Sequence, residues 1–286
     1  MKISKLLITT AAGAVALATS AHAAESLLSS VDTLNANLEA AGLNYRAEYA
    51  EILTTDSVEE AGVTRFFNNR GNKQLTADFV PGDTRRAWST PDANGITWTR
   101  DNQNTFDVTP AEQSAAIANA MGTWEAQKCS APGLNGGDVP FNTGVTLGES
   151  GVTADIMHNG FYPAAVFSPG VLAVTITYIF INPDSSPTDI NNDGLADTAF
   201  REIYYNDGWD WRTNGSTYDI ETVALHEAGH GLSQGHFGTA FRDSGTGKLH
   251  FAPRAVMNAA YSGVQQDIKG TDKGGHCSIW ASWPNN

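Results

Sequence analysis

The spacing of apolar positions along the chain predicts two helices in its first half. Residues 26–43 (SLLSSVDTLNANLEAAGL) carry apolar side chains at helical spacing and predict an amphipathic helix. Residues 109–128 predict a second helix, because Thr109 and Glu112 can form a capping box and Pro110 suits the first helical position. Apolar residues recur at helical spacing through the rest of that segment.

Four other segments have the patterns of β-strands. The segment ITWT (96–99) alternates between apolar and polar residues, and VLAVTITYIFI (171–181) is apolar enough to be buried on both faces. GVTADIMH (151–158) and AFREIYYN (199–206) are also expected to be strands. Together with the helices they predict an α/β (α+β) protein.

A third helix is expected in STYDIETVALHEAGHGL (residues 216–232). Ser216, Thr217 and Asp219 are all candidate N-caps, and an apolar face begins at Val223. The segment GTDKGGHCSIW (270–280) predicts a short helix near the C-terminus, with Asp272 in its first turn.

The first residues have the composition of an export signal. Lys2 and Lys5 precede a short apolar run, and AHA at 21–23 fits the rule for cleavage after small residues. We therefore expect residues 1–23 to be a signal peptide and the protein to be secreted or periplasmic. A membrane anchor is the alternative, but the apolar run is short and rich in Ala and Thr.

The net charge narrows the classes of binding partner, and the two cysteines predict a disulfide. A net charge of −14 argues against a nucleic acid or an anionic membrane as partner. No later stretch is long and apolar enough to insert into a membrane. The two cysteines, Cys129 and Cys277, are expected to pair in an oxidising compartment, and two buried free thiols are the alternative.

The segment HEAGHGLSQGH (226–236) carries the clearest chemistry of the chain. His226 and His230 are four residues apart, so on a helix both imidazoles project from one face, as two ligands of one zinc ion require. Glu227 lies beside that face, where a carboxylate can take a proton from a zinc-activated water. A surface cluster of solvated histidines is the alternative.

His236 can join the other two histidines only if the helix ends soon after His230. A continued helix would carry its side chain about 9 Å along the axis and rotate it away. Two hypotheses explain the bend: Ser233 adopts a strained turn, or Gly235 moves the turn by two residues.

The motif resembles the metzincin signature H-E-x-x-H-x-x-G-x-x-H, and the chain around it resembles the matrixins (peptidase family M10) of the bacterial secreted type. RAVMNAAYSG (254–263) resembles their methionine turn, which assigns Met257 to the floor beneath the metal and Tyr261 to the substrate pocket. The resemblance covers about residues 85 to 286. It implies a twisted mixed sheet, mostly parallel, with a catalytic helix, a zinc cleft and an irregular C-terminal subdomain.

The departures from the family pattern change some expectations. Ser233 replaces the family glycine, and Ala259 replaces the usual proline of the methionine turn. The strand at 171–181 has no histidine, so we expect one zinc ion and not two. No cysteine precedes Cys129, so a cysteine switch is excluded, and Asp83 in FVPGD either covers the zinc or, as we favour, belongs to an ordinary turn.

A second metal site is predicted in DINNDGLAD (189–197). Alternating acidic side chains in a turning loop can converge on one calcium ion, and Gly194 permits the bend. The ligands we name are Asp189, Asn191, Asp193 and Asp197. The alternative is an acidic surface turn. Asp207 and Asp210 are weaker candidates for another calcium site.

These expectations combine into one hypothesis. Residues 24–85 form an N-terminal region, which is a propeptide or a subdomain, and residues 86–286 form the metzincin-like catalytic domain. The protein is expected to be a monomeric zinc endopeptidase that acts on protein or peptide substrates and holds structural calcium. A non-catalytic, calcium-stabilised binding module with a vestigial zinc site and a zinc hydrolase of other bonds are the alternatives.

Overall fold

The structure is a computed structural model that describes residues 27–57, 63–68, 77–86, 95–101, 108–139 and 157–285. The predicted signal peptide and part of the strand expected at 151–158 lie outside the described residues.

A mixed sheet forms the centre of the protein, with the strand order β2-β1-β7-β8-β6-β4-β5 and with β3 paired to β8. Its strands are β1 (Tyr45–Thr54), β2 (Thr64–Phe66), β3 (Ala77–Asp78), β4 (Ile96–Asp101), β5 (Leu134–Val139), β6 (Met157–Tyr162), β7 (Val171–Phe180) and β8 (Ala196–Asn206). The short strands β9 (Trp211–Arg212) and β10 (Tyr218–Asp219) pair with each other, as do β11 (Thr239–Arg242) and β12 (Leu249–Ala252).

Strand direction divides the sheet into two parts. The pairs β4–β5, β4–β6 and β6–β8 are parallel, whereas β7–β8, β1–β7 and β1–β2 are antiparallel. The mixed α/β class and the mixed sheet are confirmed: with β3–β8, four of the seven pairings in this sheet are parallel, and the other three form an antiparallel side. That side includes β1 and β2 from the segment 24–85, in which the sequence pattern predicted no strand.

The helices are α1 (Val31–Ala40), α2 (Pro110–Glu125), α4 (Ile220–Gly231) and α5 (Gly270–Trp280). The capping box of Thr109 and Glu112 is present at the start of α2, as predicted. Of the three candidate caps for α4, Asp219 is the one used, and its carboxylate accepts the backbone N–H of Thr222.

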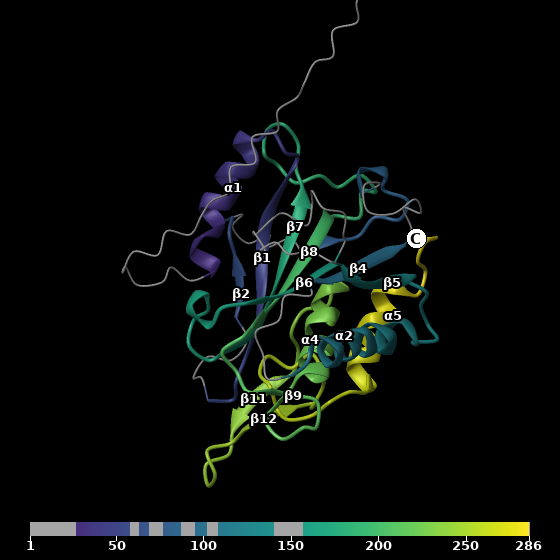
Figure 1. Ribbon diagram of the computed structural model, residues 1–286. Helices are drawn as coiled ribbons and strands as arrows, with labels where there is room; N and C mark the ends of the chain where they lie inside the picture. The colour runs from purple at the N-terminus through teal and green to yellow at the C-terminus, as the bar shows by residue number, and fades with distance from the viewer. Residues whose placement is uncertain are drawn as a thin grey trace, which may run out of the picture.

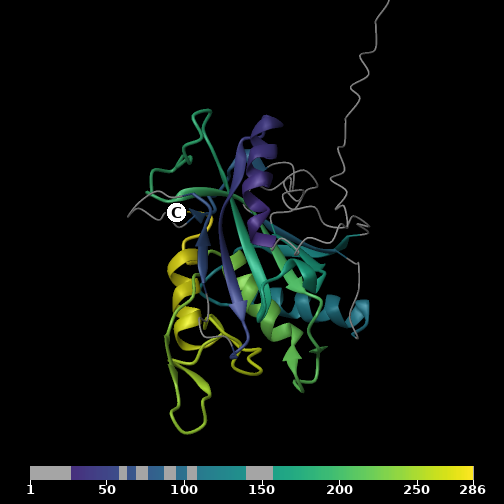
Figure 2. The same cartoon turned by 90° about the vertical axis from the view of Figure 1, so that its left-hand side faces the viewer.

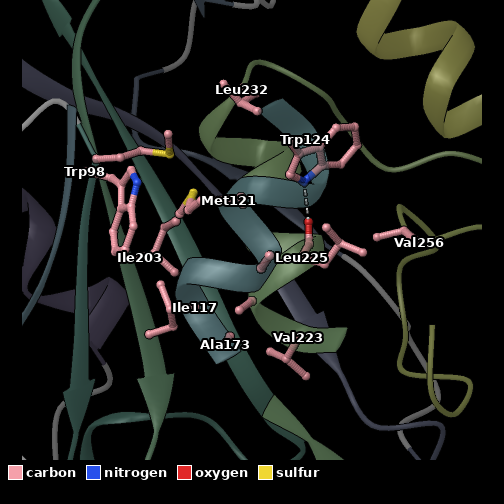
Figure 3. Packing of buried hydrophobic residues seen from close by; sticks show 14 of the residues in the cluster. Trp98, Ile117, Met121, Trp124, Ala173, Ile203, Val223, Leu225, Leu232 and Val256 are labelled. Carbon is pink, nitrogen blue, oxygen red and sulfur yellow. Dashed lines mark hydrogen bonds between the residues drawn. The ribbon is translucent and has the colours of Figure 1, made fainter. Parts of the chain in front are cut away.

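The helices cover the sheet from two sides (Figures 1 and 2). A large apolar cluster joins α2 and α4 to one face, and a second cluster joins α1 to the other face. Figure 3 shows the first cluster, in which the Trp124 indole N–H of α2 donates to the Leu225 carbonyl of α4 at 2.9 Å. The helix that carries the histidine motif is therefore fixed between α2 and the sheet.

β1 belongs to the same sheet as the strands of the predicted catalytic domain. It pairs with β7 along its whole length, and nine of its ten residues are buried. The proposed division of the chain at residue 85 stays a prediction, but the segment before it supplies strands to the common sheet.

Cys129 and Cys277 form the predicted disulfide, with their Cα atoms 5.6 Å apart. The bond joins the chain just after α2 to α5. Among the described residues, no helix combines the length and apolar character that crossing a bilayer requires.

Replacing both cysteines by serine should lower the free energy of unfolding by about 4–5 kcal/mol, because the disulfide closes a loop of nearly domain length in the unfolded chain. The measurement is urea denaturation of the oxidised wild type and of the Cys129→Ser/Cys277→Ser variant. Equal midpoints would show that the crosslink does not stabilise the fold.

Candidate metal centre

The three histidines of the motif meet at their Nε2 atoms and form the cluster that we call the histidine triad (His226, His230 and His236). The Nε2 atom of His230 lies 3.0 Å from that of His226 and 3.2 Å from that of His236, and the third distance is 3.2 Å. Tetrahedral zinc with Zn–N bonds of about 2.0–2.1 Å would set such nitrogens about 3.3–3.4 Å apart. Within the described residues, the triad is the one group of three or more His, Cys, Asp or Glu side chains that could hold a metal ion.

Backbone hydrogen bonds fix the tautomers of two of these histidines. The Nδ1–H of His226 donates to the Val256 carbonyl at 2.7 Å, and that of His230 donates to the Gln234 carbonyl at 2.6 Å. Since neutral imidazole carries one N–H, their Nε2 lone pairs point at each other and repel unless a cation lies between them. Burial also lowers the pKa of His226 to about 4, which favours the neutral ligand form. The donor set therefore fits a zinc ion.

The bend that brings His236 to the triad is made at Ser233. Its φ of +69° is left-handed, a conformation that costs a residue other than glycine about 1 kcal/mol. The first of the two hypotheses for the bend is thus confirmed, and Gly235 is not among the positive-φ residues.

Arg201 of β8 stabilises the end of α4 at this bend. Its guanidinium donates to the Gly231 carbonyl at 2.7 Å and to the Ser233 hydroxyl at 3.0 Å. The same hydroxyl donates to the Asp78 carboxylate at 2.7 Å. A serine at this position therefore contributes contacts that a glycine could not make, which offsets its backbone strain.

Glu227 is fully buried, and only one of its two carboxylate oxygens has a hydrogen-bond partner. Its Oε2 accepts the Thr175 hydroxyl of β7 at 2.6 Å, while its Oε1 has no hydrogen-bond partner. Burial raises the pKa of this carboxyl to about 8. A bound dication would lower this pKa, because it favours the carboxylate form.

Met257 lies against α4 between the first two ligands. A Cβ atom added at Gly229 would fall 2.3 Å from the Met257 sulfur and 3.0 Å from Trp124. The glycine before His230 therefore permits the helix to pack closely on the methionine, whose side chain is fully buried. The predicted role of Met257 as a floor beneath a metal ion stays a prediction.

Asp272 anchors the methionine segment from α5. Its two carboxylate oxygens accept the backbone N–H groups of Val256 and Met257 at 2.9 and 3.0 Å. The Val256 carbonyl in turn accepts from His226. The sequence placed Asp272 only in the first turn of a helix. In the structure it holds the backbone segment whose carbonyl accepts from His226, and it thereby positions that histidine.

The carboxylate of Glu51, on β1, lies close to His236. Its Oε2 atom is 3.4 Å from Nδ1 of His236 and accepts the hydroxyl of Thr64, on the neighbouring strand β2, at 2.7 Å. Burial raises the pKa of Glu51 to about 7. No sequence signal identified Glu51 or Thr175, since both depend on the pairing of β1 with β7.

Tyr261 bridges three segments around the centre. Its hydroxyl accepts the Asp219 N–H at 3.1 Å and donates to the Thr217 carbonyl at 3.3 Å, at the start of α4. Its backbone N–H donates to the Thr54 carbonyl of β1 at 2.8 Å. The predicted role of Tyr261 in a substrate pocket stays a prediction.

The predicted calcium ligands make hydrogen bonds and an ion pair within the protein. Asp189 accepts the N–H groups of Asp193 and Gly194, and the Asn191 amide donates to Asp193. Asp197 is buried and binds the Arg85 guanidinium at 2.7 Å. The assignment of these four residues to a calcium ion stays a prediction.

The remaining acidic candidates have partners of their own. Asp83 binds the guanidinium of Arg85 at 2.7 Å, which agrees with an aspartate in a turn rather than one that covers the zinc. Asp207 accepts the Ala164 N–H, and Asp210 pairs with Arg212.

In comparisons with known proteins, no family matches the chain and no curated protein is similar to it.

The close contact at Gly229 gives a matched pair of variants. Gly229→Ala should lower the free energy of unfolding by about 1–3 kcal/mol and weaken zinc binding, because the methyl group displaces Met257. Gly274→Ala in α5 meets no atom within 4 Å and should stabilise the protein by up to about 1 kcal/mol. Thermal melting and zinc titration measure both effects; a Gly229→Ala variant as stable as wild type would refute the contact.

Removing the Asp272 carboxylate should leave two buried N–H groups without acceptors. We expect Asp272→Ala to cost about 2–4 kcal/mol of stability and to weaken zinc affinity about tenfold or more. The control is Asp267→Ala, since Asp267 is exposed and pairs only with the exposed Lys269. Urea denaturation and competition with a zinc chelator test both, and unchanged zinc affinity in Asp272→Ala would exclude a positioning role.

Proposed function

We propose that the protein is an exported, zinc-dependent endopeptidase of the metzincin type. The observation that carries the proposal is the convergence of three imidazole Nε2 atoms within 3.2 Å, in a motif that also supplies a buried glutamate. The disulfide and the signal-like N-terminal sequence support export. The single triad among the described residues supports one zinc ion.

The chain supplies the parts that hydrolysis of a peptide bond requires. The triad would hold the ion, which when bound supplies Lewis acidity toward a carbonyl and acidifies water. Glu227 is the general base: Thr175 holds one of its oxygens, and the other is free to accept the proton of the attacking water. The same carboxyl then donates that proton to the leaving amine nitrogen.

The surrounding residues keep this arrangement fixed. Val256 and Gln234 orient two of the imidazoles, and Asp272 holds the segment that carries Val256. Met257 closes the apolar side of the site against the helix. The side chains lie on rigid elements, which limits reorganisation during the reaction.

A set of histidine and glutamate variants tests the proposal. Glu227→Gln should retain zinc but lose about 10²–10⁴-fold in kcat, because amide nitrogen cannot accept the proton. His230→Ala should lose zinc, whereas His250→Ala should keep both zinc and activity, because His250 is exposed and outside the triad. Zinc content is measured by metal analysis, and activity by hydrolysis of casein and of quenched fluorescent peptides.

Three outcomes would contradict the proposal. If the purified protein binds no zinc when the metal is supplied, the proposed metal centre is wrong. If Glu227→Gln leaves cleavage unchanged, the proposed role of Glu227 as general base is wrong. Zinc that binds at a site accessible to peptides, with no hydrolysis of those peptides, favours the non-catalytic binding module or a hydrolase of other bonds.

A further inference from the structure

β1 covers the edge of the sheet next to the metal centre. It runs antiparallel to β7, with partners from Tyr45 with Phe180 to Thr54 with Val171. The other neighbour of β7 is β8, so β7 would be an edge strand without β1. An edge strand offers a row of backbone N–H and C=O groups to any extended chain.

The end of β1 is also held on its other side. Thr54 forms a parallel bridge with Ala260, and the Tyr261 N–H donates to the Thr54 carbonyl at 2.8 Å. Ala260 and Tyr261 lie three and four residues after Met257 in the chain. At this point β1 therefore lies between β7 and the methionine segment, and it is bonded to both.

One face of β1 is directed at the catalytic residues. Glu51 is the register partner of Thr175, the residue that binds Glu227, and its carboxylate lies 3.4 Å from His236. Leu53, on the same face, belongs to the apolar cluster that includes Met257 and the residues of α4. His226 and His230 are each only 2% exposed with β1 in place.

We propose that β1 occupies the position of the polypeptide substrate, so that the chain is latent while β1 is paired with β7. The inference rests on the proposed function. A substrate would bind as an extended strand after β1 leaves, antiparallel to β7 and parallel to residues 260–261. The main-chain bonds that hold β1 do not depend on side-chain identity, so the two chains compete for one set of partners.

The opposite reading is that β1 is simply a structural strand. Ala50 and Ile52 face α1 and pack in the second apolar cluster with Val174 and Ile176 of β7. Loss of β1 would then destabilise the sheet without opening a site. The two readings differ in what happens at the metal when β1 is displaced.

A cleavable full-length chain separates the two readings. A recognition sequence for a site-specific protease is inserted within residues 87–94, the protein is loaded with zinc, and it is assayed before and after the cut and removal of the N-terminal fragment. We expect removal to raise both the rate of zinc extraction by a chelator and peptide hydrolysis by at least about tenfold, because the open fraction sets both. The backbone amides of β7 should lose protection against hydrogen exchange.

A synthetic peptide supplies the reverse experiment. The peptide YRAEYAEILT, the sequence of β1, should slow zinc extraction and inhibit hydrolysis by the opened protein, whereas a scrambled peptide should do neither. Failure of the β1 peptide to compete would overturn the proposal.

A substitution in the uncut chain guards against failure of the cut protein to stay folded. Leu53→Asp places a carboxylate in the apolar cluster beside α4 and should raise both rates about tenfold by expelling β1. The matched control is Leu34→Asp, because Leu34 lies on α1 and packs on the other cluster. If both variants only lower the melting temperature, β1 is structural and the proposal is wrong.

The outcomes also separate this inference from the proposed function. An uncut chain as active as the opened one overturns the inference and leaves the peptidase intact. Faster zinc extraction without hydrolysis of any peptide overturns the peptidase, and with it the assignment of the β1 position to a substrate.

Discussion

The centre depends on three imidazoles whose Nε2 atoms meet at one point, two of them held with their lone pairs turned inward. In the absence of a cation such an arrangement is repulsive, so other contacts must hold it. Two backbone carbonyls fix His226 and His230, and a left-handed residue, Ser233, brings His236 back. The fold holds the three imidazoles in this arrangement before any metal is bound, which would reduce the reorganisation that metal binding requires.

The supports of the triad come from distant parts of the chain. Arg201 of β8 stabilises the bend after α4, and Asp272 of α5 holds the segment that accepts from His226. Trp124 of α2 donates to α4 one residue before the motif begins. A single local motif therefore depends on three elements packed around it, and the affinity for metal is coupled to the stability of the whole sheet and its helices.

The elements that depend on residues close together in the sequence could be predicted from the sequence alone. The capping box at Thr109, the helix of the motif and the strand from residue 171 follow from spacing and capping alone, and the structure contains all three. The left-handed Ser233 was one of two open hypotheses, since sequence gives no measure of the contacts that offset its strain. β1 was missed, because both of its faces are buried by contacts with distant segments, among them α1 on one face and the cluster that includes α4 on the other.

The candidate site also contains residues that local spacing identifies and residues that only the fold brings close. The three ligands and Glu227 could be named from their spacing, whereas Glu51, Thr175 and Asp272 act through pairings between segments far apart in the chain. The calcium hypothesis involves such a pairing too. The pattern at 189–197 could not show that Asp197 is bound by Arg85, more than 100 residues earlier in the chain.

The disulfide also bears on the histidine triad. Cys277 is on the same helix as Asp272, which holds the backbone next to His226, so the crosslink to Cys129 restrains the support of that imidazole. Reduction of the bond would leave the helix held by hydrogen bonds and packing alone. The redox state of one cysteine pair would thereby act on the geometry around a histidine about fifty residues away in the chain.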